Sequence, residues 1–178
     1  GAALGIRVTL VMPSNVTEAR KKITSAYGAE IVFSDPMEGS DGAIHHVRRI
    51  VAENPEKYFY PDQYSNESNP KAHYLGTGPE ILAALGDRLT HLVAGIGTGG
   101  TIMGAGRRLK EHRQQIQLVG IEPEGALHGL EGLKHMETAL RPEIYDAAVA
   151  DENVEVSTEE AYEMVKRLCA RGRRTTSC

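Results

Sequence analysis

The stretch that decides the fold is residues 93–104, which read VAGIGTGGTIMG. The apolar run ending at Ile96 predicts a buried strand, and the glycines after it predict a tight turn into a helix. Glycines lack a Cβ, so backbone N–H groups can converge on an anion there, and the positive end of the helix dipole adds to the attraction. Thr98 and Thr101 add hydroxyl donors. The stretch therefore predicts a phosphate site; the alternative is a glycine turn that only lets the helix pack close to the sheet.

Short apolar runs alternate with helical patterns on both sides of this stretch. Asn15, Thr77 and Ser157 are predicted helix caps. The polar segment 61–78, rich in Asn, Pro and Gly, predicts a long irregular loop. The alternation is typical of parallel strands joined by crossover helices, so the predicted fold class is α/β, with three-layer parallel sheets. The predicted strands are 7–12, 30–33, 58–60, 91–96 and 117–121, and the predicted helices are 15–27, 41–53, 77–85, 101–112 and 157–168.

Three phosphate ligands compete for the glycine turn. A nucleotide triphosphate loop needs a Lys after its last glycine, but Thr101 and Ile102 follow Gly100, so this interpretation fails. Residues 95–100 do satisfy the dinucleotide pattern G-x-G-x-x-G, and Glu122 lies where a ribose-binding acid is expected, so an NAD-dependent oxidoreductase stays an alternative. A compact monophosphate needs neither Lys nor Mg²⁺ when several N–H groups converge on it. Pyridoxal 5′-phosphate fits that description.

The composition of the chain limits the classes of molecule that it is expected to bind. The 178 residues are 40% hydrophobic and 25% charged, with 20 basic and 24 acidic side chains and a net charge of −4. A mildly acidic surface gives nucleic acid or anionic lipid little to bind, because Lys and Arg supply that affinity. No apolar run approaches the ~20 residues of a membrane span. The expected partners are therefore small molecules, with no nucleic acid and no membrane, and the absence of a secretion signal predicts a cytoplasmic location.

The cysteines and histidines do not predict a disulfide framework or a metal site. Two cysteines are too few for a framework, two adjacent histidines on a helix point apart, and two others lie seven residues apart without further ligands. The residues concerned are Cys169, Cys178, His45, His46, His128 and His135.

Several stretches in the same order resemble one enzyme family. The glycine turn GIGTGGTI (residues 95–102) is followed by GRRLKE (106–111), and upstream lie DQYSNESNPKAHY (62–74) and TGPE (77–80). Downstream lie VGIEP (119–123) and HGLEGL (128–133). Together they resemble the cysteine synthase and cystathionine β-synthase family of pyridoxal-phosphate enzymes, up to about Ala170, with bacterial cysteine synthases the most similar. Tyr64 departs from the more usual Phe of that pattern.

The resemblance implies a fold, residue roles and an activity. The fold is that of fold-type II pyridoxal-phosphate enzymes, which is tryptophan synthase β-like, here incomplete. The cofactor phosphate would be held by Gly97, Thr98, Gly99, Gly100 and Thr101. Gln63 would face the substrate carboxylate, and Gly132 would lie beside the cofactor ring. The implied reaction is β-replacement, O-acetylserine plus sulfide giving cysteine, with cystathionine β-synthase or serine/threonine dehydratase activity as alternatives.

The same resemblance shows what this sequence lacks. The family's Schiff-base lysine in a Ser-x-Lys context is missing, as is the Ser/Thr-Gly-Asn-Thr-Gly loop after it, and residues 173–178 do not match the family's Ser-Ser-Gly segment. Each lysine lies in a polar context that is typical of solvated surface, so no catalytic residue is assigned. These lysines are Lys21, Lys22, Lys57, Lys71, Lys110, Lys134 and Lys166.

We therefore expect an internal fragment of a longer enzyme, inactive by itself and homodimeric when full length. Residues 1–62 are predicted to belong to a smaller mobile domain and residues 63–178 to a larger domain that binds the phosphate. A non-catalytic phosphate-binding fragment or pseudoenzyme is the alternative from another functional class.

Overall fold

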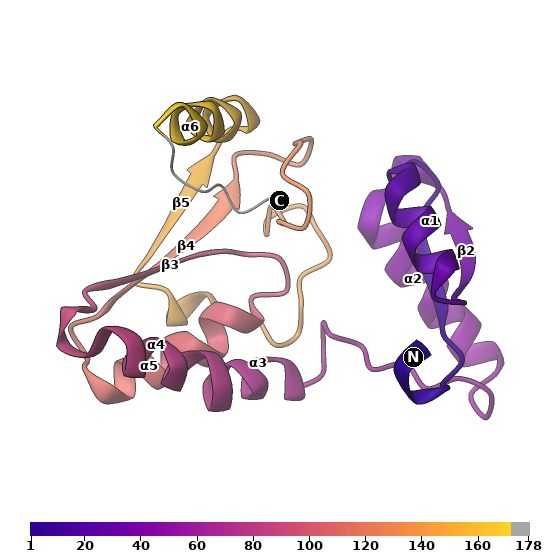
Figure 1. The fold of residues 1–178 in the computed structure, drawn as a ribbon, viewed down its shortest axis with the longest axis horizontal. Coiled ribbons are helices and arrows are strands. Elements are labelled where there is room, and N and C mark those ends of the chain that lie inside the picture. Colours follow the sequence, from indigo (N-terminus) through magenta and orange to yellow (C-terminus); the bar gives the residue numbers. More distant parts are fainter. Residues whose placement is uncertain (172–178) are drawn as a thin grey trace. The chain divides into compact units, whose positions relative to one another are not determined.

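Parallel strands followed by helices build both parts of the chain (Figure 1). The computed structural model describes residues 1–171, so the predictions made for 173–178 and for Cys178 lie outside the described residues. Contacts divide the chain into two units, Gly1–Tyr60 and Pro61–Cys178. The predicted α/β class with parallel sheets is confirmed.

The first unit is a two-stranded parallel sheet with helices. Strand β1 (Thr9–Pro13) pairs with β2 (Glu30–Ser34), in a register that runs from Thr9 opposite Glu30 to Pro13 opposite Ser34. Helix α1 (Glu18–Ala26) connects them, and α2 (Gly39–Glu53) follows β2. Short 3-10 turns cover Ala2–Leu4 and Pro36–Glu38.

Two local predictions for this unit are wrong. Helix α1 is capped by Thr17, whose hydroxyl accepts from the Arg20 amide at 3.4 Å, and not by Asn15. Residues 58–60 form no strand, and the Phe59 side chain is 89% exposed. An apolar run becomes a strand only where another strand can pair with it, and in this unit the sheet consists of β1 and β2.

The second unit contains a three-stranded parallel sheet in the order β3-β4-β5. Strands β3 (His91–Gly95) and β4 (Gln117–Pro123) match the predictions to within two residues. Strand β5 (Glu152–Val156) is absent from the predicted strands, because its sequence ENVEV carries two glutamates. It lies at the edge of the sheet, and its residues are exposed or half-buried. Helix α6 (Thr158–Ala170) is capped by Ser157, which forms the predicted capping box with Glu160.

A continuous helical run replaces most of the loop predicted over 61–78. It comprises α3 (Ser68–Ala72), the π-helical turn η3 (His73–Thr77) and α4 (Gly78–Leu85), and a 3-10 turn, η4 (Gly86–Arg88), follows. Pro70 lies in the first turn of α3, where its missing N–H costs no helical hydrogen bond. Thr77 is inside the helix and not its cap, and its hydroxyl pairs with His73 Nδ1 at 3.0 Å.

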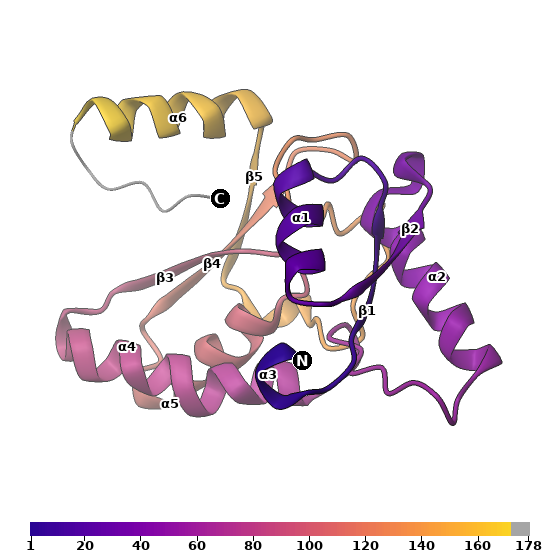
Figure 2. The ribbon, with the colours of Figure 1, turned by 45° about the vertical axis from the view of Figure 1, so that its right-hand side comes forward.

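Two helical segments follow the glycine turn and lie in the same layer as α3 and α4. They are the π-helical turn η5 (Ile102–Gly106) and α5 (Arg107–His112). Gly104 lets η5 approach α3, because a Cβ at this position would overlap the carbonyl oxygen of Pro70. Both ribbon views show α3, α4 and α5 along one face of the three-stranded sheet (Figures 1 and 2). A last 3-10 turn, Ala147–Val149, precedes β5.

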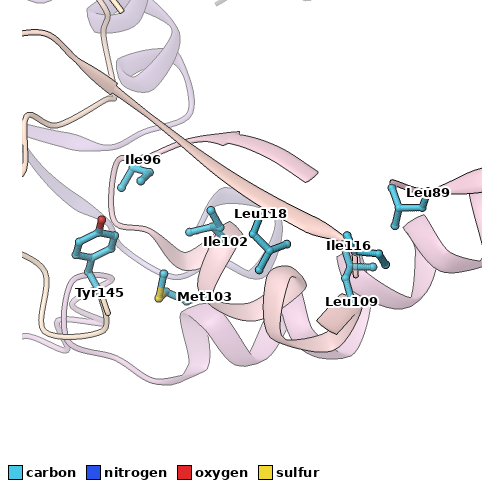
Figure 3. Close-up of a cluster of buried hydrophobic side chains, with 8 residues drawn as sticks. All are labelled: Leu89, Ile96, Ile102, Met103, Leu109, Ile116, Leu118 and Tyr145. Carbon is cyan, nitrogen blue, oxygen red and sulfur yellow. The ribbon is translucent and has the colours of Figure 1, made fainter. Parts of the chain in front are cut away.

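The core of the second unit lies between this helical layer and the sheet. Figure 3 shows it as a row of side chains, with Tyr145 and Met103 at one end and Leu89 and Ile116 at the other. Leu118 joins the row from β4 and is fully buried. The glycine turn therefore connects a strand and a helical segment that both pack on this core. That packing fixes where β3 ends and where the next helix begins. Within residues 1–171, no helix is both long and apolar enough to cross a bilayer.

Candidate functional site

The glycine turn connects β3 to the helical segment that begins at Gly100. Gly99 has a φ of +84°, in the region that favours glycine, and a Cβ on it would lie 2.8 Å from Tyr145 Cδ2. Among the described residues, no hydrogen bond is found for the amides of Gly97, Thr98, Gly99 and Thr101. Unpaired amides at the start of a helix are the groups that bind anions.

The loop that contains Gly132 lies directly against this turn. The carbonyl oxygen of Gly132 occupies the space that a Cβ of Gly97 would fill. The Lys134 amide donates to the Ile96 carbonyl at 2.9 Å, and so holds the loop beside the end of β3. Gly132 itself has a φ of +89°. Glycine at both positions therefore permits two backbone segments to lie in contact, although they are distant in sequence.

Helix α6 anchors the far end of the same loop. The Gly129 amide donates to Thr158 Oγ1 at 2.9 Å, and the Tyr162 hydroxyl donates to the Gly129 carbonyl at 3.2 Å. A Cβ at Gly129 would lie 2.8 Å from that hydroxyl oxygen. The loop is thus fastened at Gly129 and again at Lys134, with Gly132 between the two anchors.

Gln63 is joined to the glycine turn through Asn69. The Asn69 Nδ2 atom donates to the Gln63 carbonyl at 2.7 Å and to Thr98 Oγ1 at 3.1 Å. The Gln63 side chain is exposed, so it is accessible to a solute. Asn69 is the residue that sequence reasoning missed. Its stretch contributed to the family resemblance, but no spacing rule assigns a role to an asparagine in a segment expected to be a loop.

One lysine departs from the prediction that all of them lie on the solvated surface. Lys134 is only 5% exposed, and its Nζ lies 5.3 Å from the centre of the Tyr64 ring. The reason is the backbone hydrogen bond to Ile96, which draws the loop inward and carries the side chain beneath the ring. A cation over an aromatic face is attracted by the ring quadrupole.

Glu122, the acidic residue that the dinucleotide interpretation assigns to a ribose, forms hydrogen bonds within the protein. Glu122 Oε2 accepts from the Met136 amide at 3.1 Å, and its Oε1 accepts from the Tyr145 hydroxyl at 3.5 Å. Burial of Tyr145, together with the negative charge of Glu122, raises the pKa of the phenol. The carboxylate therefore fastens the loop after β4 to the core, and the dinucleotide interpretation loses the residue on which it depended.

His128, on the same loop, also forms a hydrogen bond within the protein. His128 Nδ1 accepts from the Leu130 amide at 3.1 Å, and burial followed by the charge of His135 lowers the pKa of His128. Within residues 1–171, no three side chains of His, Cys, Asp or Glu gather in a way that could hold a metal ion.

Comparisons with known proteins identify a family for the chain. A family model described as pyridoxal-phosphate dependent enzyme matches residues 1–176. The chain is 53% identical over 168 residues to a cysteine synthase of Aquifex aeolicus, covering 94% of this chain and 51% of the relative. It thus spans about half the length of the curated relatives that it matches.

Solved structures of related enzymes share the fold. A cysteine synthase (OASS) from Entamoeba histolytica has a TM-score of 0.85 at 32% identity, over 96% of this chain and 52% of that one. An O-acetylserine dependent cystathionine beta-synthase from Helicobacter pylori has a TM-score of 0.81 at 32% identity, over 93% and 55%.

Proposed function

Since the chain belongs to the pyridoxal-phosphate dependent enzyme family, we propose that residues 97–101 hold the cofactor phosphate in a cysteine synthase. The observation that carries the proposal is the turn itself, which presents four amides without a hydrogen-bond partner among the described residues. A Cβ at Gly97, Gly99 or Gly100 would enter space that neighbouring atoms already occupy. Such a backbone cradle fits a compact dianion that needs neither Lys nor Mg²⁺.

In this proposal, the bound cofactor and three residues, Gln63, Gly132 and Thr98, have separate roles. Bound pyridoxal phosphate supplies an electron sink that stabilises negative charge at the α-carbon of an amino acid. The exposed side chain of Gln63 binds the substrate carboxylate, and Gly132 leaves room for the cofactor ring. The Thr98 hydroxyl adds a donor to the phosphate.

The proposed reaction of the whole protein is β-replacement: O-acetylserine and sulfide give cysteine and acetate. The identity to the Aquifex cysteine synthase supports this choice. Cystathionine β-synthase activity is the second candidate, and the likeness to the Helicobacter enzyme supports it. A homodimer, a cytoplasmic location and a mobile smaller domain over residues 1–62 belong to the same proposal, as implications of the family resemblance.

We also propose that this chain alone does not catalyse the reaction. The family's imine-forming lysine, with the loop after it, is absent from its sequence. Without that base the proton-transfer steps have no partner of suitable pKa. Incubation of the purified chain with cofactor, O-acetylserine and sulfide should give no cysteine, and cysteine formation above the protein-free rate would refute the proposal.

Phosphate recognition is tested separately by calorimetry. Pyridoxine 5′-phosphate has no aldehyde, so it cannot react with surface lysines, and pyridoxine is the matched ligand without phosphate. The chain should bind the phosphorylated form about 10- to 100-fold more tightly, as expected for hydrogen bonds to a charged group. Equal affinities would overturn the proposal. NAD binding that is lost in Glu122→Gln would instead favour the dinucleotide interpretation.

A further inference from the structure

We propose that Asn69 is a positioning residue of this site, which fixes the Thr98 hydroxyl as a hydrogen-bond donor toward the bound phosphate. The inference rests on the proposed function and deepens it, because it concerns how the same turn recognises its ligand. It is carried by the two hydrogen bonds of the Asn69 side-chain nitrogen and by the contact of its oxygen with Gly100.

The orientation of the Asn69 amide follows from its partners. A backbone carbonyl can only accept a hydrogen bond, so the atom 2.7 Å from the Gln63 oxygen must be the nitrogen, Nδ2. The same nitrogen lies 3.1 Å from Thr98 Oγ1. An NH₂ group has two hydrogens and no acceptor capacity, so the Thr98 oxygen must accept in this pair.

The Thr98 hydroxyl then has its own proton left to donate. Its oxygen accepts from Asn69 and also, more weakly, from the Gly100 amide at 3.4 Å. A hydroxyl has two acceptor lone pairs and one O–H, so both acceptor positions are used. Within residues 1–171 the O–H has no acceptor, and it belongs to a residue flanked by the amides of Gly97 and Gly99, which have no hydrogen-bond partner in the same range. A phosphate group accepts only, so this polarity is the one that a phosphate requires.

Gly100 makes the arrangement possible. A Cβ on Gly100 would overlap the Asn69 side-chain oxygen, so that oxygen rests against the first turn of the helix. The backbone of Asn69 is held as well, because its amide donates to the Asn66 carbonyl at 2.9 Å. Asn69 is half-buried, and water therefore competes less for its amide than it would on an open surface.

The test is the ratio of dissociation constants for pyridoxine and pyridoxine 5′-phosphate. In Asn69→Asp the carboxylate accepts only, so the Thr98 proton turns toward the new carboxylate and away from the ligand. We expect the phosphate preference to fall by about 10- to 100-fold. Asn66→Asp is the matched control, because Asn66 lies in the same segment and its side chain donates to the Pro61 carbonyl at 2.8 Å and accepts from the Ser68 amide at 2.9 Å, with no hydrogen bond to the glycine turn among the described residues. It should keep the preference within about threefold.

A double-mutant cycle separates hydroxyl polarity from the added charge. Thr98→Val removes the hydroxyl, while the carboxylate introduced by Asn69→Asp would still repel phosphate. In the Thr98→Val background, the loss caused by Asn69→Asp should therefore shrink by about fivefold or more. If the two substitutions instead lower the phosphate preference independently, so that their fold losses multiply in the double variant, the role of Asn69 is refuted. Asn69→Ser, a neutral variant, serves the same cycle if Asn69→Asp does not fold.

The outcomes also distinguish this inference from the proposed function. If the wild-type chain shows no phosphate preference, the proposed function fails. If the wild type shows the preference and Asn69→Asp retains it, the proposed function stands and the role of Asn69 is wrong. A merely structural effect of Asn69 on the turn would persist in the Thr98→Val background, so the double-mutant cycle distinguishes it from a role that acts through the Thr98 hydroxyl.

Discussion

Substituting Gly97 with alanine tests the contact on which the site depends. The new Cβ would overlap the Gly132 carbonyl oxygen, which is a backbone atom and cannot rotate aside. Either the loop withdraws or the glycine turn shifts. The loop cannot withdraw freely, because the Lys134 amide bonds the Ile96 carbonyl at 2.9 Å and the Gly129 amide bonds Thr158.

The expected cost follows from these contacts. Overpacking by one methyl group destabilises by about 1–3 kcal/mol, and stretching the bond from Lys134 to Ile96 adds about 1 kcal/mol. Alanine lowers the entropy of the unfolded chain, which returns about 0.4–1 kcal/mol. Gly97→Ala should therefore lower the free energy of unfolding of the second unit by about 2 kcal/mol.

Gly125→Ala is the control for this measurement. A Cβ on Gly125 would meet no atom within 4 Å, and its φ is not positive, so alanine there should be neutral or stabilising by up to about 1 kcal/mol. The two units need not unfold together, so a single global transition is a poor measure. Native-state hydrogen exchange of the Ile96 amide, which donates to Ile121, reports the second unit alone. Gly97→Ala and Gly125→Ala agreeing within about 0.5 kcal/mol would refute the reasoning.

Two further predictions concern charged side chains. Lys134→Met should destabilise its unit by about 1–2 kcal/mol, since it removes a desolvated cation–π contact. Lys57→Met, at a similar ring distance but exposed, should cost only about 0.5 kcal/mol, with native-state hydrogen exchange read in the unit that contains each lysine. The hydrogen bond from Lys110, and then that from the Leu118 amide, lowers the pKa of Asp151 below its ordinary 3.8. Its stabilising contribution is therefore complete above about pH 5 and is lost as the pH falls through the folded pKa. Asp151→Asn should flatten the acid limb of a plot of unfolding free energy against pH, and an unchanged limb would contradict this.

The sequence predicts the elements whose periodicity and punctuation agree. The apolar run before Ile96 and the glycines after it predict both the strand and the turn, and Ser157 with Glu160 predicts the start of α6. The loop predicted for residues 68–77 is wrong for the opposite reason. Their polar side chains, Pro70 and a glycine indicate a loop, whereas in the structure these residues form a packed helix. Proline tolerance in a first turn and glycine at a helix contact are decided by tertiary position, which local composition does not contain.

The candidate site residues also divide into those that a sequence pattern indicates and those that it does not. The glycines of residues 97–101 attract notice because their spacing has a known electrostatic consequence. Lys134 and Asn69 have no such signal, since a polar neighbourhood in sequence describes both an exposed lysine and one drawn beneath an aromatic ring. What distinguishes them is one backbone bond to Ile96 and one amide contact with Thr98, each of which joins segments that are distant in sequence.

The glycine turn therefore does not act alone. Its shape is held by the Gly132 carbonyl on Gly97 and by the Asn69 amide on Thr98 and Gly100. Both supports come from segments outside the glycine motif, and both require that a glycine lack its Cβ. A glycine-rich motif transplanted into another α/β sheet would carry the unpaired amides but not these supports. Its affinity for phosphate should accordingly fall well below that of the native turn, even with every glycine retained, because preorganised donors lose less entropy on binding.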